Sequence, residues 1–253
     1  MNNLKIVFFG SSRFSTFVLE ELEKAGFKIS LNITNARDPL PMEELKVLGA
    51  DLFIVASFGK ILPKELIDMP KFKTLNVHPS LLPHLRGPAP IQGAILKDDK
   101  TGVSIIRMDE KMDHGPLLAT RPIDINPWPD HYDTVEEKLG QAGGKLLAEI
   151  LPQWIEGNLK EESQDESLAT YIKLIKKEDG LIDMNDKAET NLRKVLAYST
   201  WPGAYMFFKK KNGEEARIVI KNAKIEDGVF SPTRVIPAGK KEMAWQDFLR
   251  GNA

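Results

Sequence analysis

Short apolar runs alternate with segments of helical periodicity between residues 4 and 155. The apolar runs lie at 4–9, 28–34, 51–57, 74–78, 102–108 and 116–125, and helical spacing marks 14–25, 42–49 and 134–155. Short apolar runs bounded by turn residues predict buried strands. Strands that alternate with helices favour a parallel sheet with helices on both faces. We therefore predict an α/β, Rossmann-like domain over residues 1–157.

The pattern changes after Gly157. Residues 158–177 are polar and lack periodicity, which predicts a linker. Residues 187–199 have helical spacing, and 204–225 is typical of two strands joined at Asn212-Gly213, a strong hairpin signal. These features predict a second, mostly β domain over residues 178–253.

Composition excludes several kinds of chemistry. The chain has no cysteine, so disulfides, thiolate nucleophiles and cysteine-based zinc sites are excluded. Residues 171–253 carry 16 Lys and Arg against 11 Asp and Glu, a balance of +5 within a total formal charge of −1. This excess is a weak indication of an anionic partner, and ordinary solvated side chains explain it equally well. Because the sequence shows no signal-peptide core and no window of membrane-spanning length, we expect a cytoplasmic protein without a membrane partner.

Two polar side chains stand at the end of the fourth predicted strand, in "LNVHPSLLPHLRGPAPIQGAIL" (75–96). Asn76 and His78 are two residues apart, so their side chains share one face of the strand. Open α/β sheets bind ligands outside the carboxyl ends of their strands. The prolines that follow restrict the backbone, which suits a rigid binding wall.

A carboxylate follows the next predicted strand, at Asp113 in "MDEKMDHG" (108–115). If the two strands are neighbours, Asp113 can reach His78, favour its imidazolium form and hold the ring in place. Without cysteine or a serine elbow, Asn76, His78 and Asp113 can polarise a carbonyl, stabilise an oxyanion and move a proton. This set predicts acyl transfer between two nitrogens without a metal. A structural histidine remains the alternative on spacing alone, and a metal site that adds His114 matches no ligand spacing.

At these residues the sequence resembles the folate-dependent formyltransferases, and within them the enzymes that act on methionyl-tRNA. "LNVHPSLLPHLRGPAPIQGAI" is similar to the family's Asn-x-His loop with its SLLP segment, and "MDEKMDHGPLL" to the loop that bears its aspartate. The segments "FFGSSRF", "FIVASFGKILPKELIDMP", "YSTWPGAYMFF" and "PAGKKEMAWQDFLRG" resemble further family segments in the same order. The likeness covers most of the chain.

The resemblance implies a transferase that moves the formyl group of 10-formyltetrahydrofolate to the α-amino group of initiator methionyl-tRNA, for translation initiation. It implies that Asn76, His78 and Asp113 are the catalytic residues and that no metal is needed. It also implies that the second domain is a small OB-like β-barrel, a fold that suits nucleic-acid backbones. We expect the protein to act as a monomer.

The resemblance also assigns binding residues. The folate donor is expected at the SLLP segment and at a neighbouring strand end, through Ser80, Leu81, Leu82, Pro83, Ala56, Phe58 and Gly59. The acceptor substrate is expected at Phe14, Gly10, Arg86, Lys209, Lys210 and Lys211. The three lysines fall on the predicted hairpin, where either phosphate contact or a solvated tip is consistent with the sequence.

Three alternatives belong to other acceptors or another class. The enzyme that formylates glycinamide ribonucleotide shares the Asn-x-His loop, but it typically has a G-x-G-S turn where this chain has "FFGSSRF". Sugar-nucleotide N-formyltransferases share the three polar residues, and a non-catalytic tRNA- or folate-binding relative would not need all three. Two segments are short for a methionyl-tRNA enzyme, "NARDPLP" (35–41) and the stretch between "AKIEDG" and "VIPAGKK", which predicts weaker discrimination among tRNAs.

Overall fold

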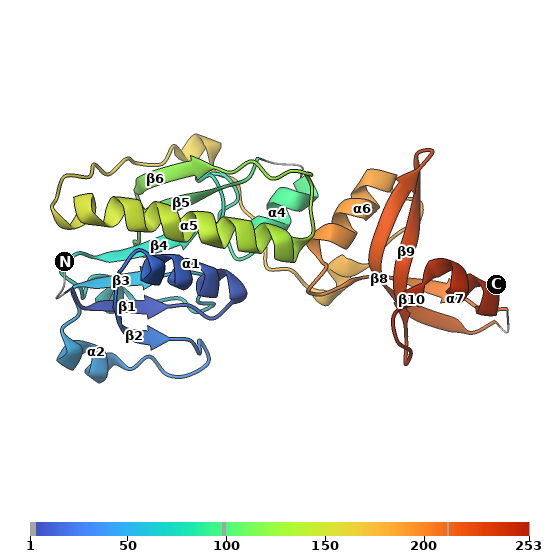
Figure 1. Cartoon of the computed structure of the whole chain (residues 1–253), viewed down its shortest axis with the longest axis horizontal. Coiled ribbons are helices and arrows are strands. Elements are labelled where there is room, and N and C mark those ends of the chain that lie inside the picture. Colours follow the sequence, from blue (N-terminus) through green and yellow to red (C-terminus); the bar gives the residue numbers. More distant parts are fainter. Residues whose placement is uncertain (1–3, 98–99, 212, 253) are drawn as a thin grey trace. The chain divides into compact units, whose positions relative to one another are not determined.

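The computed structural model describes residues 4–97, 100–211 and 213–252 (Figure 1). It contains two compact units. The first comprises Met1–Pro90, Lys100–Asp124 and Glu136–Lys173, and the second comprises Ile91–Asp99, Ile125–Val135 and Leu174–Ala253. Within the described residues, no helix is both long and apolar enough to cross a membrane.

The first unit is built on a six-stranded sheet in the order β2-β1-β3-β4-β5-β6. Its strands are β1 (Ile6–Phe9), β2 (Ile29–Ile33), β3 (Leu52–Val55), β4 (Thr74–His78), β5 (Gly102–Arg107) and β6 (Leu117–Pro122). Its helices are α1 (Arg13–Lys24), α2 (Met42–Leu48), α3 (Lys64–Ile67) and α5 (Tyr132–Ile155). The first residues of α5 belong to the second unit, as does all of α4 (Pro90–Lys97) after Pro90. The predicted Rossmann-like α/β architecture is confirmed.

The sheet differs from the prediction in the direction of two strands. Strands β2, β1, β3 and β4 are parallel, whereas β5 runs antiparallel to β4, and β6 antiparallel to β5. Apolar periodicity reports burial and not direction, so the sequence did not distinguish these strands from the parallel ones. As a consequence, the loop between β5 and β6 begins beside Thr74, where the Met108 N–H donates to the Thr74 carbonyl at 2.8 Å.

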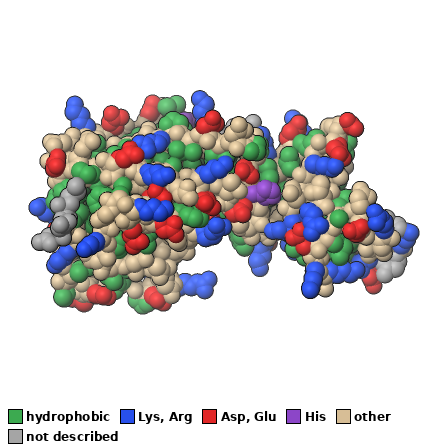
Figure 2. Space-filling model, viewed as in Figure 1, with side chains coloured by type: hydrophobic (Ala, Val, Ile, Leu, Met, Phe, Trp, Pro, Cys, Tyr) green, Lys and Arg blue, Asp and Glu red, His purple; other side chains and the backbone are tan. Residues whose placement is uncertain are grey.

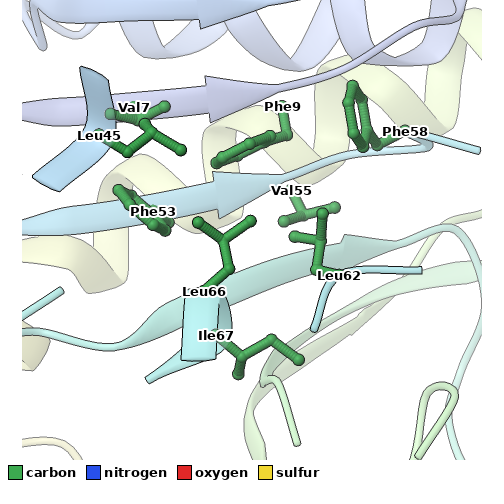
Figure 3. Close-up of a cluster of buried hydrophobic side chains, with 9 residues drawn as sticks. All are labelled: Val7, Phe9, Leu45, Phe53, Val55, Phe58, Leu62, Leu66 and Ile67. Atoms are coloured by element: carbon green, nitrogen blue, oxygen red, sulfur yellow. The ribbon is translucent and has the colours of Figure 1, made fainter. Parts of the chain in front are cut away.

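One face of this sheet carries an aromatic-rich core under α2 and α3 (Figure 3). Alternate residues of a strand point to the same face, and this alternation sends Phe9 and Phe53 into the cluster. The Phe9 ring packs edge-on against Phe53 and against Phe58, each with centroids 5.4 Å apart. The buried members are Val7, Phe9, Leu45, Phe53, Val55, Phe58, Leu62, Leu66 and Ile67. Asn76 pairs with Val55 across the ladder, so Asn76 and His78 lie on this face.

The opposite face is covered by α1 and α5 (Figure 1). Glycines of α5 allow this close approach, because a Cβ added at Gly143 would lie 2.6 Å from Val77 Cγ1 and one added at Gly140 would lie 2.8 Å from Phe17 Cβ. Helix α1 begins at a capping box in which the Ser15 N–H donates to Ser12 Oγ at 3.3 Å. Helix α5 therefore packs closely against one face of β4, and Asn76 and His78 lie on the other face of this strand.

The second unit contains a four-stranded antiparallel sheet in the order β10-β9-β8-β7. Its elements are α6 (Ala188–Ala197), β7 (Ala204–Lys209), β8 (Glu215–Glu226), β9 (Val229–Pro237), β10 (Met243–Ala244) and α7 (Trp245–Asn252). The predicted hairpin pairs Lys209 with Glu215, and Gly213 has a positive φ of 85°, while Asn212 lies outside the described residues. The mostly β second domain is confirmed, and β9 forms in the segment that is short for the family.

The predicted linker is ordered along the first unit as far as Lys173. Glu162 and Leu117 exchange two backbone hydrogen bonds of 2.9 and 2.8 Å, and Tyr171 forms a parallel bridge with Arg86. A turn of 3-10 helix, Glu166–Leu168, lies between these contacts. The sequence predicted a linker here; the segment is largely exposed, and backbone groups of the first unit bind it.

Candidate active site

Asn76, His78 and Asp113 come together on one face of the sheet. Asp113 Oδ1 lies 3.4 Å from His78 Nδ1 and accepts a 3.4 Å hydrogen bond from Asn76 Nδ2. The sequence predicted this contact from neighbouring strands, and β4 and β5 are neighbours. Because β5 is antiparallel, Asp113 arrives by a loop that folds back over the sheet, with a positive φ of 51° at Asp113 itself.

The His78 ring is held through both of its nitrogens. Nδ1 faces the Asp113 carboxylate, and Nε2 lies 3.2 Å from the carbonyl oxygen of Leu85. Leu85 is buried and has a positive φ of 60°, which turns its carbonyl toward the ring. Both partners are hydrogen-bond acceptors, so the site fixes the plane of the imidazole from two sides.

Asp113 is charged in a nearly closed position, with a side chain that is 12% exposed. Its burial acts to raise the pKa, but the positive charge and hydrogen bond of His78 act against it. The Gly87 N–H, which donates to Asp113 Oδ2 at 2.8 Å, and the charge of Arg86 also lower it. The net result is a pKa of Asp113 below its ordinary value, so the carboxylate is ionised at neutral pH.

The SLLP segment is tied to the neighbouring strand by a buried serine. Ser104 Oγ donates to the Ser80 carbonyl at 2.7 Å and accepts from the Leu82 N–H at 3.0 Å. Ser80 Oγ in turn donates to the His84 carbonyl at 2.7 Å. Sequence reasoning dismissed Ser104 as a nucleophile and missed this structural role, which the pairing of Ser104 with His78 across the ladder explains.

The strand end after β3 offers backbone and not side chains. Ala56 and Phe58 are buried, and the Phe58 ring belongs to the aromatic core. Gly59 is exposed with a positive φ of 71°. Leu81 and Pro83 are half-buried, so the predicted folate-binding residues offer part-exposed apolar side chains and, at Gly59, exposed backbone.

Arg86, Phe14 and Gly10, which were predicted to bind the acceptor substrate, lie in closely packed surroundings. Arg86 is fully buried, and its guanidinium donates to side chains of the segment after α5. Phe14 is buried between α1 and α5, and a Cβ at Gly10 would lie 2.3 Å from Ser15 Cβ. All three positions are closely packed, and their assignment to the acceptor substrate stays a prediction.

Comparisons with known proteins assign the chain to a family. Residues 11–151 match the family described as formyl transferase, and residues 174–233 match the formyl transferase C-terminal domain. A methionyl-tRNA formyltransferase of Bacillus licheniformis is 40% identical over 92% of this chain and 80% of its own length. One of Bacillus subtilis is 38% identical over 83% of this chain and 73% of its own length.

The chain belongs to the formyl transferase family. The fold agrees: a methionyl-tRNA formyltransferase from Clostridium thermocellum superposes with a TM-score of 0.70 at 17% identity, covering 95% of this chain and 99% of that one. HypX from Aquifex aeolicus in complex with tetrahydrofolic acid gives a TM-score of 0.75 at 22% identity, covering 97% of this chain and 47% of that one. The predicted family resemblance is confirmed.

The three polar side chains of this formyl transferase can act together on a carbonyl. An amide N–H is a donor for an oxyanion, an imidazole can carry a proton, and an ionised carboxylate lies beside both. Of the described residues, no group of three His, Cys, Asp or Glu side chains could hold a metal ion. The site therefore supplies hydrogen-bond donors, a fixed charge and a proton-carrying ring.

The second unit of this formyl transferase carries a separate basic and aromatic surface. Arg217 lies over the Tyr205 ring at 4.0 Å, and a cavity of about 430 Å³ beside it is lined by Lys177, Trp201 and Pro202. Trp201 is 48% exposed. The sequence did not single out these residues, because Lys177 and Arg217 are 40 positions apart: the β7–β8 pairing brings Arg217 beside Tyr205, and a bridge between Leu181 and Tyr205 brings in the segment of Lys177.

The predicted lysines lie on the same hairpin. Lys209 and Lys211 are exposed, whereas Lys210 forms an ion pair with Glu214 at 3.2 Å. Along β7, Lys209 shares its face with Tyr205 because the two are four residues apart in an extended strand. Figure 2 shows basic and acidic side chains interspersed on the visible surface, so the sign of charge alone does not define a binding face.

Proposed function

We propose that this formyl transferase moves the formyl group of 10-formyltetrahydrofolate to the α-amino group of initiator methionyl-tRNA, as a cytoplasmic monomer. The observation that carries the proposal is the meeting of Asn76, His78 and Asp113 beside the SLLP segment. The relatives at 38–40% identity that bear the name methionyl-tRNA formyltransferase support the choice of acceptor.

The folate is proposed to lie against the exposed backbone at Ser57–Gly59 and the half-buried side chains of Leu81 and Pro83. This position places its formyl carbon beside Asn76 and His78. When bound, the folate supplies an activated formamide whose carbon–nitrogen bond is exchanged for one to the acceptor amine. The chain's own part is to orient that carbonyl and to stabilise the charge that develops on its oxygen.

Each polar side chain then has a distinct role. Asn76 donates an amide N–H to the carbonyl oxygen as negative charge develops on it. His78, whose ring is held between Asp113 and the Leu85 carbonyl, exchanges the proton that the acceptor amine gives up and the departing nitrogen takes. Asp113, ionised because its pKa is lowered, accepts from both and keeps them in register.

The tRNA is proposed to contact the second unit through its basic and aromatic surface. Lys177 and Arg217 can neutralise phosphates, and Trp201 offers an exposed ring on which a base can stack. Lys209 and Lys211 extend this surface along the hairpin. Lys210, already paired with Glu214, is expected to contribute less.

The test is a single-turnover assay of one protein preparation against three acceptors: methionyl-tRNA, glycinamide ribonucleotide and a 4-amino-sugar nucleotide. We expect formyl transfer from 10-formyltetrahydrofolate to methionyl-tRNA alone. Transfer to either small acceptor in preference to tRNA would replace the proposed substrate. Binding of tRNA without transfer to any acceptor would mean that the protein is a non-catalytic relative.

A further inference from the structure

The segment after α5 is fastened to the loop that follows His78. We call residues 161–172 the strap. The Arg86 N–H donates to the Thr170 carbonyl at 2.8 Å, and the Ile172 N–H donates to the Arg86 carbonyl at 2.8 Å. The Thr170 N–H donates to the Pro83 carbonyl at 3.2 Å. The strap therefore pairs with the active-site loop as a strand would.

A buried guanidinium joins the two segments. Arg86 Nη1 and Nη2 donate to the Glu166 carboxylate at 3.0 and 2.6 Å, and Nη1 also donates to Tyr171 Oη at 3.1 Å. Nε and Nη2 donate to Gln164 Oε1 at 3.1 and 2.7 Å. These five contacts match the five N–H donors of an arginine, so the whole guanidinium is used by the strap.

Gln164 links the Arg86 guanidinium to the loop that carries Asp113. Its Oε1 accepts from Arg86, while its Nε2 donates to the carbonyls of Asp113 and Gly115 at 2.9 and 2.7 Å. Nothing in the proposed chemistry needs a glutamine here. Its contacts hold the backbone of Asp113 and of Gly115, two residues later.

Thr170 holds the other catalytic partner. Its Oγ1 accepts from the Leu85 N–H at 2.9 Å, and the Leu85 carbonyl is the group that faces His78 Nε2 at 3.2 Å. Leu85 has a positive φ, a conformation that a non-glycine residue adopts only where its surroundings hold it. The strap thus contacts the immediate neighbours of both Asp113 and His78.

We propose that the strap is a positioning element of the active site, in which Gln164 aligns Asp113 and Thr170 aligns His78 through Leu85. The proposal rests on the proposed formyl transfer, because its consequence is measured in that reaction. The strap lies about 50–90 residues from its partners in sequence and touches neither Asn76 nor the SLLP side chains, so it acts through geometry alone.

The decisive variant is Gln164→Met, which keeps the length of the side chain and removes both sets of hydrogen bonds. Gln153→Met is the matched control, because Gln153 is exposed on α5. We expect Gln164→Met to lower kcat by about 10–100-fold, as a displacement of about 1 Å in a reacting group does. The KM values for folate and tRNA should stay within about 2-fold, since the hydrogen bonds of the Gln164 side chain go to Arg86, Asp113 and Gly115 and not to the proposed binding surfaces.

The pH profile separates positioning from general stability. A displaced Asp113 loses part of its contact with His78 and Gly87, so the acidic limb of kcat/KM should move to higher pH in Gln164→Met and stay in place in Gln153→Met. Gln164→Glu keeps the acceptors for Arg86 and removes the donors for the Asp113 loop. We expect that it fails to restore kcat.

Two results would overturn the proposal. One is a Gln164→Met enzyme with wild-type kcat and an unmoved acidic limb; the other is a loss confined to KM. If that variant does not fold, Thr170→Val, which removes only the acceptor for Leu85, is judged by the same criteria. A wild-type protein that formylates no acceptor would refute the proposed function itself, which is a separate outcome visible before any variant is made.

Discussion

Asp113 keeps a negative charge in a position that is almost closed to water. Its carboxylate is surrounded by the ring of His78, the amide of Asn76 and the N–H of Gly87. These partners, with Arg86, lower its pKa against the opposing effect of burial. A group whose pKa is lowered by folding stabilises the folded state at pH values above its unfolded pKa.

The stability of the protein in acid should therefore depend on Asp113. Its contribution is complete above the unfolded pKa of about 3.9 and is lost as the pH falls through the lower pKa of the folded state. We expect Asp113→Asn to reduce the free energy of unfolding by about 1–3 kcal/mol at pH 7, with a deficit that shrinks below about pH 4. Urea denaturation across this range measures it.

The control for this prediction is Asp124→Asn, the same change at an exposed aspartate. Its deficit, if any, should be small at pH 7. A deficit of Asp113→Asn that is equal at pH 3 and pH 7 would contradict the assigned electrostatics, because it would show that the charge of the carboxylate does not contribute.

At this scale the sequence predicted which polar side chains meet and not the residues that support them. Asn76 and His78 are marked by spacing on one strand, and Asp113 by its place after the next strand. Gln164 is a single polar residue in a polar segment, and its partners Arg86 and Asp113 are 78 and 51 positions away. Contacts at such separations depend on the tertiary fold, which local pattern does not report.

Among the elements, the loop after β4 has a shape that depends on a single backbone position, Gly87. Gly87 has a φ of 113°, and a Cβ there would lie 2.3 Å from the Ile172 carbonyl oxygen. Gly26, at the end of α1, has a φ of 89°, but a Cβ there would meet nothing within 4 Å. A side chain at Gly26 would therefore cause backbone strain alone, whereas a side chain at Gly87 would cause both backbone strain and a steric clash.

We expect Gly26→Ala to cost about 1 kcal/mol, the penalty for a side chain in left-handed backbone conformation. Gly87→Ala should cost about 1–3 kcal/mol more, because the strap must move away from the loop. It should also lower kcat, whereas Gly26→Ala should not. Thermal unfolding and initial rates measure both, and equal losses from the two substitutions would contradict the packing of the strap on Gly87.

Element types were predictable because burial imposes a period on the sequence. The runs at 4–9 and 74–78 fold as β1 and β4, and the stripe at 134–155 folds as α5. The direction of β5 and β6 was not predictable, since an apolar run reports the burial of a strand and not its direction. Helix α7, which packs Phe248 into the second unit, was missed because its apolar stripe is short.

Across the whole molecule, the second unit combines positive charge with exposed aromatic rings. The cavity beside Tyr205 and Arg217 is built from the end of the predicted linker, the Trp201–Pro202 turn and the β7–β8 hairpin. The charge imbalance of the sequence was only a weak indication of an anionic partner for this part of the chain. The structure adds the aromatic component, which charge counting does not detect.

Neutralising Lys209, Lys210 and Lys211 to glutamine should weaken tRNA binding and flatten its dependence on salt. Each lysine that contacts a phosphate changes the slope of log Kd against log salt by about 1. Because Lys210 is paired with Glu214, we expect the slope for the triple variant to change by about 2 and not by about 3. Trp201→Ala should weaken binding without changing the slope, since stacking releases no counterions. An unchanged slope in the triple variant would return these lysines to an ordinary solvated hairpin.

Three side chains are proposed to act together on one formyl group. The single-turnover rate of formyl transfer to methionyl-tRNA tests this cooperation most directly. For Asn76→Ala, His78→Ala and Asp113→Ala, we predict a rate lower by about 100-fold or more, as for loss of one oxyanion donor, with folate bound within a few-fold of the wild-type affinity. Near wild-type rates in these variants, or losses matched by equal losses of folate binding, would contradict the assigned roles.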